Sequence, residues 1–315
     1  MRKTLIGAAL LLKSINVAAS GAVAQTNGIE MWYETFGERE GEPLLLNMGY
    51  GCSGLCWPTE WCAQLADAGF FVIRYDQRDT GRTTKFDFES NPYDLIDMAR
   101  DAVGLLDVLE IERAHVVGFS MGGAIGQIMA VRNPERVTSL TLMSTSCDFR
   151  PATAAMMGLP TDREGWLSAP RTDYQQGMGE LFARPVESAE QLIALKVGIG
   201  KMLNGGEVEF DTAYWQGLQA AILAHTGPAN GSSHNHQSAY LRWEELVCAI
   251  PHAVRVPTLI LQGTADPLYG RDHGEALAAA IEGSRLVWVE KMGHYPNAAF
   301  YDQWTDEIRK HTGVS

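Results

Sequence analysis

Short apolar runs rich in branched residues alternate along this chain with segments of helical periodicity, and this alternation restricts the fold more than any other feature. Several runs, such as Leu44 to Leu46 and Leu259 to Leu261, are apolar at every position. Such runs are typical of parallel strands that helices cover on both faces. The sequence therefore predicts an α/β fold around a buried, mostly parallel sheet. The expected strands are residues 29–36, 43–48, 70–75, 114–117, 138–144, 257–262 and 285–289.

The alternation stops in the middle of the chain. Residues 94–109 still show one apolar stripe at helical spacing. Residues 150–252 instead have a mostly helical pattern with scattered Met and Trp residues, and they contain a polar loop at 227–238. The strand pattern resumes only near residue 256. We therefore expect one α/β domain built from residues 25–149 and 253–315, interrupted by a helical cap, or lid, at residues 150–252.

The N-terminus has the outline of a signal peptide. Arg2 and Lys3 precede the apolar stretch 4–12, and Ala22-Val23-Ala24 fits a small-x-small cleavage site before Gln25. Residues 1–24 therefore predict export to the periplasm or the medium; the alternative is a weakly amphipathic helix on a cytoplasmic protein. No stretch reaches the roughly 18 to 20 apolar residues that span a membrane.

Charge and cysteine content restrict the partners. Among 315 residues, 25 Lys and Arg stand against 38 Asp and Glu, a net charge of −13, whereas nucleic-acid binding needs a basic surface. Cys52, Cys56 and Cys62 lie close together without the paired spacing or fourth ligand of a zinc site, so no metal or cofactor is expected. If the chain is exported, a disulfide between Cys52 and Cys62 is an alternative to free thiols.

The strongest motif is a G-x-S-x-G sequence, Gly118 to Gly122, that follows the predicted strand 114–117 and precedes a helical segment. A nucleophile elbow needs a strand, a sharp turn that exposes its serine, and small residues two positions to either side. Ser120 is therefore the candidate nucleophile.

A serine nucleophile needs a base, and the base needs a group that orients it. Asp266 follows the strand 257–262 and His294 follows the strand 285–289, so both fall at the carboxyl edge of the sheet in the order Ser, Asp, His. The backbone N–H of Met121 is the expected first oxyanion donor. Tyr50, after the strand 43–48, is the expected second, with Gly49 as its alternative.

Other polar residues compete for these roles. Asp148 follows the strand 138–144 and is the rival acid, while His273 is better interpreted as a supporting or surface residue. His115 lies inside the strand before the elbow. His234 and His236 form an H-x-H pair without further ligands, and we interpret them as part of the polar lid loop.

These residues together resemble the α/β-hydrolase superfamily, with the closest likeness at residues 74–83, 114–123 and 134–137 and in the Asp266 and His294 loops. Residues 48–58 and 74–83 resemble the aclacinomycin methylesterase branch, whose members cleave methyl esters on aromatic polyketides. The resemblance implies an eight-stranded, mostly parallel sheet with a helical cap between strands six and seven.

The expected function is hydrolysis of a small to medium apolar carboxylic ester, such as a methyl ester, through an acyl-enzyme. Cofactor-free haloperoxidases or perhydrolases, lactonases and carbon–carbon bond hydrolases of the same fold use similar triads, so these activities stay open. A receptor with this fold but without catalysis is a further alternative.

Overall fold

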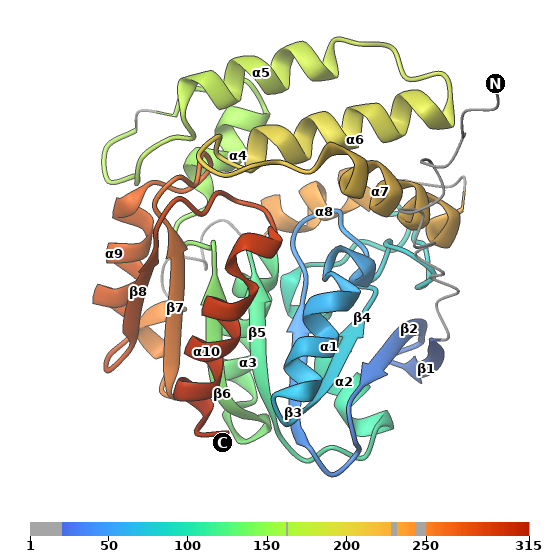
Figure 1. Cartoon of the computed structure of the whole chain (residues 1–315), viewed down its shortest axis with the longest axis vertical. Helices are drawn as coiled ribbons and strands as arrows, with labels where there is room; N and C mark the ends of the chain where they lie inside the picture. Colours follow the sequence, from blue (N-terminus) through green and yellow to red (C-terminus); the bar gives the residue numbers. More distant parts are fainter. Residues whose placement is uncertain (1–20, 162, 228–231, 243–249, 315) are drawn as a thin grey trace, which may run out of the picture.

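The computed structural model describes residues 21–161, 163–227, 232–242 and 250–314. Within them, eight strands form one sheet in the order β1-β2-β4-β3-β5-β6-β7-β8 (Figure 1). The β1/β2 and β2/β4 pairs are antiparallel, and all other neighbours are parallel. The strands are β1 (Ala22–Thr26), β2 (Ile29–Phe36), β3 (Glu42–Asn47), β4 (Phe70–Tyr75), β5 (Ala114–Phe119), β6 (Val137–Met143), β7 (Thr258–Gly263) and β8 (Arg285–Val289).

The predicted fold class is confirmed, and every predicted strand is present. The bounds agree for β2, β4 and β8, and they shift by one or two residues at the ends of the others. Strand β1 was not predicted. Only Ala24 of its five residues is buried, so this edge strand shows neither an apolar run nor an alternation.

Two layers of helix explain why the central strands are apolar at every position. Helices α1 (Thr59–Asp67) and α10 (Tyr301–Thr312) cover one face, where Leu44 and Leu46 pack with Trp61 and Trp304. Helices α2 (Leu95–Val108), α3 (Met121–Arg132) and α9 (Arg271–Ala280) cover the other face, where Leu45 belongs to a second core cluster. Because consecutive side chains of a strand point to opposite faces, each strand needs apolar residues throughout.

Among the described residues between β6 and β7 there are five α-helices, and we refer to them as the inserted helices. They are α4 (Arg150–Met156), α5 (Thr172–Phe182), α6 (Ala189–Leu203), α7 (Thr212–Thr226) and α8 (Ser232–Leu241). Figure 1 shows them across the top of the sheet. The prediction of a polar loop at 227–238 was wrong for its second half, because residues from Ser232 onward belong to α8.

The predicted leader lies mostly outside the described residues, which begin at Gly21. The expected cleavage site does not: Ala22, Val23 and Ala24 belong to β1, and Ala24 is buried against the core. Among the described residues, no helix combines the length and the apolar character that crossing a bilayer requires.

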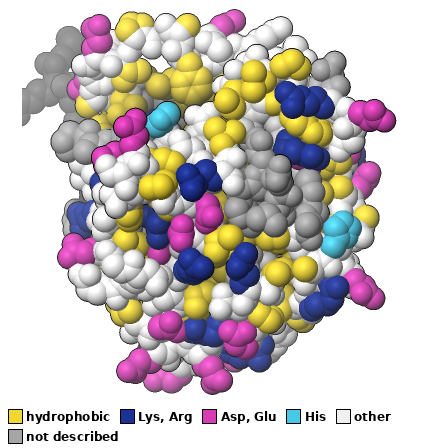
Figure 2. All heavy atoms as spheres, turned by 180° about the vertical axis from the view of Figure 1, so that it is seen from behind, with side chains coloured by type: hydrophobic (Ala, Val, Ile, Leu, Met, Phe, Trp, Pro, Cys, Tyr) yellow, Lys and Arg dark blue, Asp and Glu magenta, His cyan; other side chains and the backbone are white. Residues whose placement is uncertain are grey.

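Charges of both signs are interspersed on the face shown in Figure 2, with hydrophobic side chains between them. The excess of acidic residues in the sequence is therefore not gathered into one large acidic field on this face.

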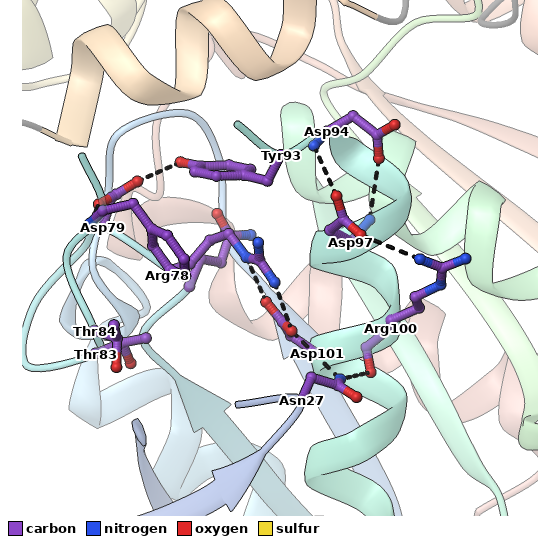
Figure 3. A network of polar contacts seen from close by, with 12 residues as sticks. Asn27, Arg78, Asp79, Thr83, Thr84, Tyr93, Asp94, Asp97, Arg100 and Asp101 are labelled. Atoms are coloured by element: carbon purple, nitrogen blue, oxygen red, sulfur yellow. Dashed lines mark hydrogen bonds and ion pairs between the residues drawn. The ribbon is translucent and has the colours of Figure 1, made fainter. Parts of the chain in front are cut away.

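Helix α2 is anchored to the loop after β4 by a buried ion pair (Figure 3). Arg78 donates from Nε and Nη2 to the two carboxylate oxygens of Asp101 at 2.7 and 2.9 Å, and its guanidinium lies 4.7 Å from the centroid of the Tyr93 ring. The helix itself begins at a capping box, in which Asp94 and Asp97 exchange hydrogen bonds with each other's backbone N–H. The buried ion pair and the capping box thus fix the position and the start of α2.

We expect Asp101→Ala to lower the free energy of unfolding by about 3 kcal/mol, because it leaves the buried Arg78 guanidinium without its counter-ion. Urea denaturation measures the change. The matched control is Arg100→Ala, which removes an exposed ion pair with Asp97 and should cost about 0.5 kcal/mol or less. Equal losses in the two variants would contradict the importance of the buried pair.

Candidate active site

The turn between β5 and α3 places Ser120 in a strained conformation. Its φ of 53° and ψ of −121° lie outside the regions that non-glycine residues normally occupy. Backbone passes closely on both sides: a Cβ on Gly118 would lie 2.3 Å from the Gly122 carbonyl oxygen, and one on Gly122 would lie 2.1 Å from the Asn47 carbonyl oxygen. Hydrogen bonds from the Ser120 N–H to the Met143 carbonyl, and from the Thr145 hydroxyl to the Ser120 carbonyl, hold the turn in place.

Asp266 and His294 meet at the same edge of the sheet. Nδ1 of His294 lies 2.8 Å from Oδ2 of Asp266, and both side chains are buried. The other carboxylate oxygen accepts hydrogen bonds from the backbone N–H groups of Leu268 and Tyr269 at 2.8 and 2.9 Å. With a carboxylate on one ring nitrogen, the imidazole carries its proton on Nδ1, so Nε2 can act as the base.

The structure brings this pair to the serine. The His294 ring packs 5.2 Å from the ring of Phe119, the residue before Ser120, and 5.3 Å from the ring of Tyr269. The Tyr269 side chain, which packs on His294, also interacts electrostatically with the Ser120 side chain. The three residues predicted from the sequence therefore lie in one buried cluster, with exposed fractions of 8% for Ser120, 5% for Asp266 and 4% for His294.

The loop after β3 lies directly beside the elbow. A Cβ on Gly49 would lie 3.3 Å from the Ser120 Cβ, and the Gln77 amide donates to the Met48 carbonyl at 2.8 Å. Tyr50 is the next residue, so both predicted candidates for the second oxyanion donor belong to this loop. The first candidate, Met121, begins α3, where a backbone N–H has no partner within the helix.

His236 has a structural role that the sequence interpretation missed. The sequence predicts that it belongs to the polar lid loop, but it is a buried residue of α8. Its Nδ1 accepts from the Gly51 N–H at 3.0 Å, and its Nε2 donates to the Arg78 carbonyl at 2.9 Å. These partners require a neutral imidazole. An inserted helix therefore fixes the loop that carries Tyr50, and no motif in the sequence signals this contact.

The rival residues are engaged elsewhere. Asp148 forms an ion pair with Arg150 at 2.7 Å. His273 lies 2.7 Å from the Ser146 hydroxyl, and His115 lies 2.8 Å from the Ser139 hydroxyl. None of these hydrogen bonds and ion pairs joins a rival residue to Asp266 or His294.

His234 is exposed on α8, and among the described residues no group of three or more His, Cys, Asp or Glu could hold a metal ion. Cys52, Cys56 and Cys62 are free thiols, so the structure contains no Cys52–Cys62 disulfide. Burial raises the pKa of Cys62 to about 12, which keeps its thiol protonated at neutral pH. Cys248 lies outside the described residues.

The neutral state of His236 predicts an acid-sensitive fold. Burial lowers its pKa to about 4, whereas an unfolded histidine titrates near 6.5. The unfolded state therefore binds the proton first, and stability present above pH 6.5 is lost as the pH falls toward 4, by up to about 3 kcal/mol from this residue. His115, whose pKa burial also lowers to about 4, acts in the same direction.

We expect His236→Gln to reduce the slope of unfolding free energy against pH between about 6.5 and 4, as measured by urea denaturation at several pH values. His234→Gln, two residues away on the exposed side of α8, is the control and should keep the wild-type slope. An unchanged slope in the His236 variant would show that this histidine does not titrate with folding.

Comparisons with known proteins identify the family of the chain. A family model described as the alpha/beta hydrolase fold matches residues 42–298. The chain is 34% identical over 291 residues to the rhodomycin D methylesterases DauP of Streptomyces sp. (strain C5) and DnrP of Streptomyces peucetius, covering 90% of this chain and 95% of each relative. The crystal structure of a hydrolase from Pseudomonas aeruginosa PA01 superposes with a TM-score of 0.68 at 25% identity, covering 94% of this chain and 99% of that one. The chain therefore belongs to the α/β-hydrolase fold family, in the branch that contains the rhodomycin D methylesterases.

Proposed function

We propose that the protein hydrolyses carboxylic esters by serine acyl transfer, with Ser120 as nucleophile, His294 as base and Asp266 as the group that orients the imidazole. The observation that carries this proposal is the buried 2.8 Å contact between His294 and Asp266 beside a serine held at a strained elbow. A surface histidine or a turn-forming aspartate would not need such burial. Strain at a nucleophile exposes the hydroxyl to substrate, which a purely structural turn does not require.

The geometry supports the following sequence of steps. Nε2 of His294 takes the Ser120 proton as Oγ attacks the ester carbonyl, and the resulting imidazolium is stabilised by Asp266. The N–H groups of Met121 and Tyr50, with Gly49 as the alternative to Tyr50, would bind the oxyanion. His294 then passes the proton to the departing alcohol, and water repeats the steps to release the acid.

The class of enzyme follows from the family: the chain is a carboxylesterase of the α/β-hydrolase fold. For the substrate we propose a methyl ester on an apolar, aromatic molecule, because the two relatives are named as methylesterases of rhodomycin D. Aromatic side chains next to the histidine support this choice. Tyr295 follows His294 and packs 4.2 Å from Trp215 of α7, which in turn stacks on Phe210.

We also propose that the inserted helices form the lid of this site. Two contacts join them to loops that carry the proposed machinery, and a third joins them to the loop after β4. The His294 N–H donates to the Leu203 carbonyl at the end of α6, at 2.6 Å. Gly51 donates to His236 of α8, and His225 of α7 lies 2.7 Å from the buried Asp76, in the loop after β4.

Ser120→Ala should reduce kcat for a methyl ester and for a p-nitrophenyl ester by about 10⁴-fold or more while the protein stays folded, because the nucleophile is lost. Initial rates, circular dichroism and labelling with a fluorophosphonate probe test this. Ser139→Ala, which removes another buried serine of the same sheet, should retain both activity and labelling. Activity in the Ser120 variant would disprove the nucleophile assignment, and tight ligand binding by the wild type without labelling would favour a receptor.

The position of β1 sharpens the proposal of an exported protein. Cleavage before Gln25 would remove Ala22, Val23 and Ala24, three residues of a strand that pairs with β2. Cleavage before Gly21, after Ala18-Ala19-Ser20, also fits a small-x-small site and keeps the strand intact. We therefore propose that a signal peptidase, if it acts on this chain, cuts before Gly21.

Expression of the full chain in a Gram-negative host, followed by N-terminal sequencing of the periplasmic fraction, is expected to give a mature chain that begins at Gly21. A chain engineered to begin at Gln25 should unfold at lower urea concentration than one that begins at Gly21, since it loses strand hydrogen bonds worth about 1 kcal/mol each. Recovery of only uncleaved protein from the cytoplasm would contradict export.

A further inference from the structure

Tyr269 is held by both residues of the proposed acid–base pair. It lies three positions after Asp266, is only 4% exposed, and donates its backbone N–H to Asp266 Oδ1 at 2.9 Å. Its ring stands at 72° to the ring of His294, with the centroids 5.3 Å apart. The side chain is therefore positioned by the same contacts that position the imidazole.

The Tyr269 side chain also interacts with the nucleophile. Its phenol interacts electrostatically with the side chains of Ser120 and of Tyr240, a buried residue of α8. Tyr240 is itself fixed by Phe149, whose ring lies 5.1 Å from its own. Burial raises the pKa of Tyr269 above its ordinary value, so the phenol stays protonated and can donate a hydrogen bond at neutral and mildly alkaline pH.

The place of this hydroxyl relative to His294 indicates which substrate atom it would meet. A base that takes the serine proton must later give that proton to the leaving-group oxygen, so this oxygen has to come within reach of the imidazole. Tyr269 touches both His294 and Ser120. The oxyanion candidates come from a different loop, after β3, and from the start of α3.

We propose that Tyr269 is a further catalytic residue, whose hydroxyl donates a hydrogen bond to the leaving-group oxygen of the ester when the tetrahedral intermediate breaks down. This inference rests on the proposed function of Ser120 and His294. The bond between the carbonyl carbon and the leaving oxygen breaks, its electron pair stays on that oxygen, and the proton comes from the His294 imidazolium. Tyr269 keeps its own proton and stabilises the negative charge that develops before the transfer is complete.

This role matters most for alcohols that leave poorly. Methoxide is strongly basic and develops a large charge on oxygen, whereas p-nitrophenolate spreads its charge over the ring and leaves without help. The hydroxyl should therefore favour methyl esters over activated aryl esters of the same acid.

The test is the ratio of kcat/KM for the methyl ester to kcat/KM for the p-nitrophenyl ester of phenylacetic acid, in the wild type and in Tyr269→Phe. We expect the ratio to fall by about 10-fold or more, since loss of one preorganised donor costs at least that much. The variant keeps the ring that packs on His294, so a merely structural defect lowers both rates alike. An unchanged ratio would overturn the proposal.

Two companion variants make the outcome unambiguous. Ser120→Ala reports on the proposed function: if it keeps activity, the nucleophile assignment fails whatever Tyr269 does. Tyr240→Phe removes the hydroxyl behind Tyr269 and should lower the same ratio by a smaller factor. Should Tyr269→Phe be recovered unfolded, Tyr240→Phe carries the test, and an unchanged ratio there overturns the proposal.

Discussion

The close approach of backbone on both sides of Ser120 is the constraint on which the rest of the site depends. Gly122 lies against the Asn47 carbonyl at the end of β3, and Gly118 lies against the backbone of Gly122 itself. A side chain at Gly118 would push α3 away from β5, and one at Gly122 would push α3 away from the end of β3. Only with both glycines can the chain reverse so sharply that the serine stands at φ 53° beside the loop after β3.

The sheet then determines what can reach that serine. Strands β3, β5, β6, β7 and β8 are parallel neighbours, so the loops at their carboxyl ends lie side by side. Asp266 and His294 follow β7 and β8 and meet there, although 28 positions separate them in the chain. The inserted helices reach the same edge. Their contacts with the backbone of His294 and Gly51 help to hold both loops in place.

The fold could be predicted from the sequence because its signals are local and repeated. Apolar runs such as Leu44 to Leu46 predict buried strands wherever they occur. A serine between glycines directly after such a strand is typical of a nucleophile elbow and of few other structures. The edge strand β1 could not be found in this way, because Ala24 alone is buried and no pattern arises from one residue. Helix α8 also escapes prediction, because its first seven residues, Ser-Ser-His-Asn-His-Gln-Ser, are all polar and are typical of a loop. Only packing on the core makes this segment a helix.

The candidates Asp266 and Asp148 show where the sequence stops being informative. Each follows a strand of the sheet and is a plausible partner for a histidine, but Arg150 neutralises one, while His294 and two backbone N–H groups engage the other. Tyr269 and His236 carry no motif at all. Their roles depend on contacts with Ser120 and Gly51, residues more than a hundred positions away.

The sequence by itself determined the α/β class, the elbow and the order of the three polar residues, because strand pattern, turn chemistry and chain order are properties of neighbouring residues. The tertiary structure decided which carboxylate pairs with the histidine, which hydroxyl stands beside the serine, and which inserted helix holds the loop after β3. Such choices follow from burial and distance between remote segments, which no local pattern encodes.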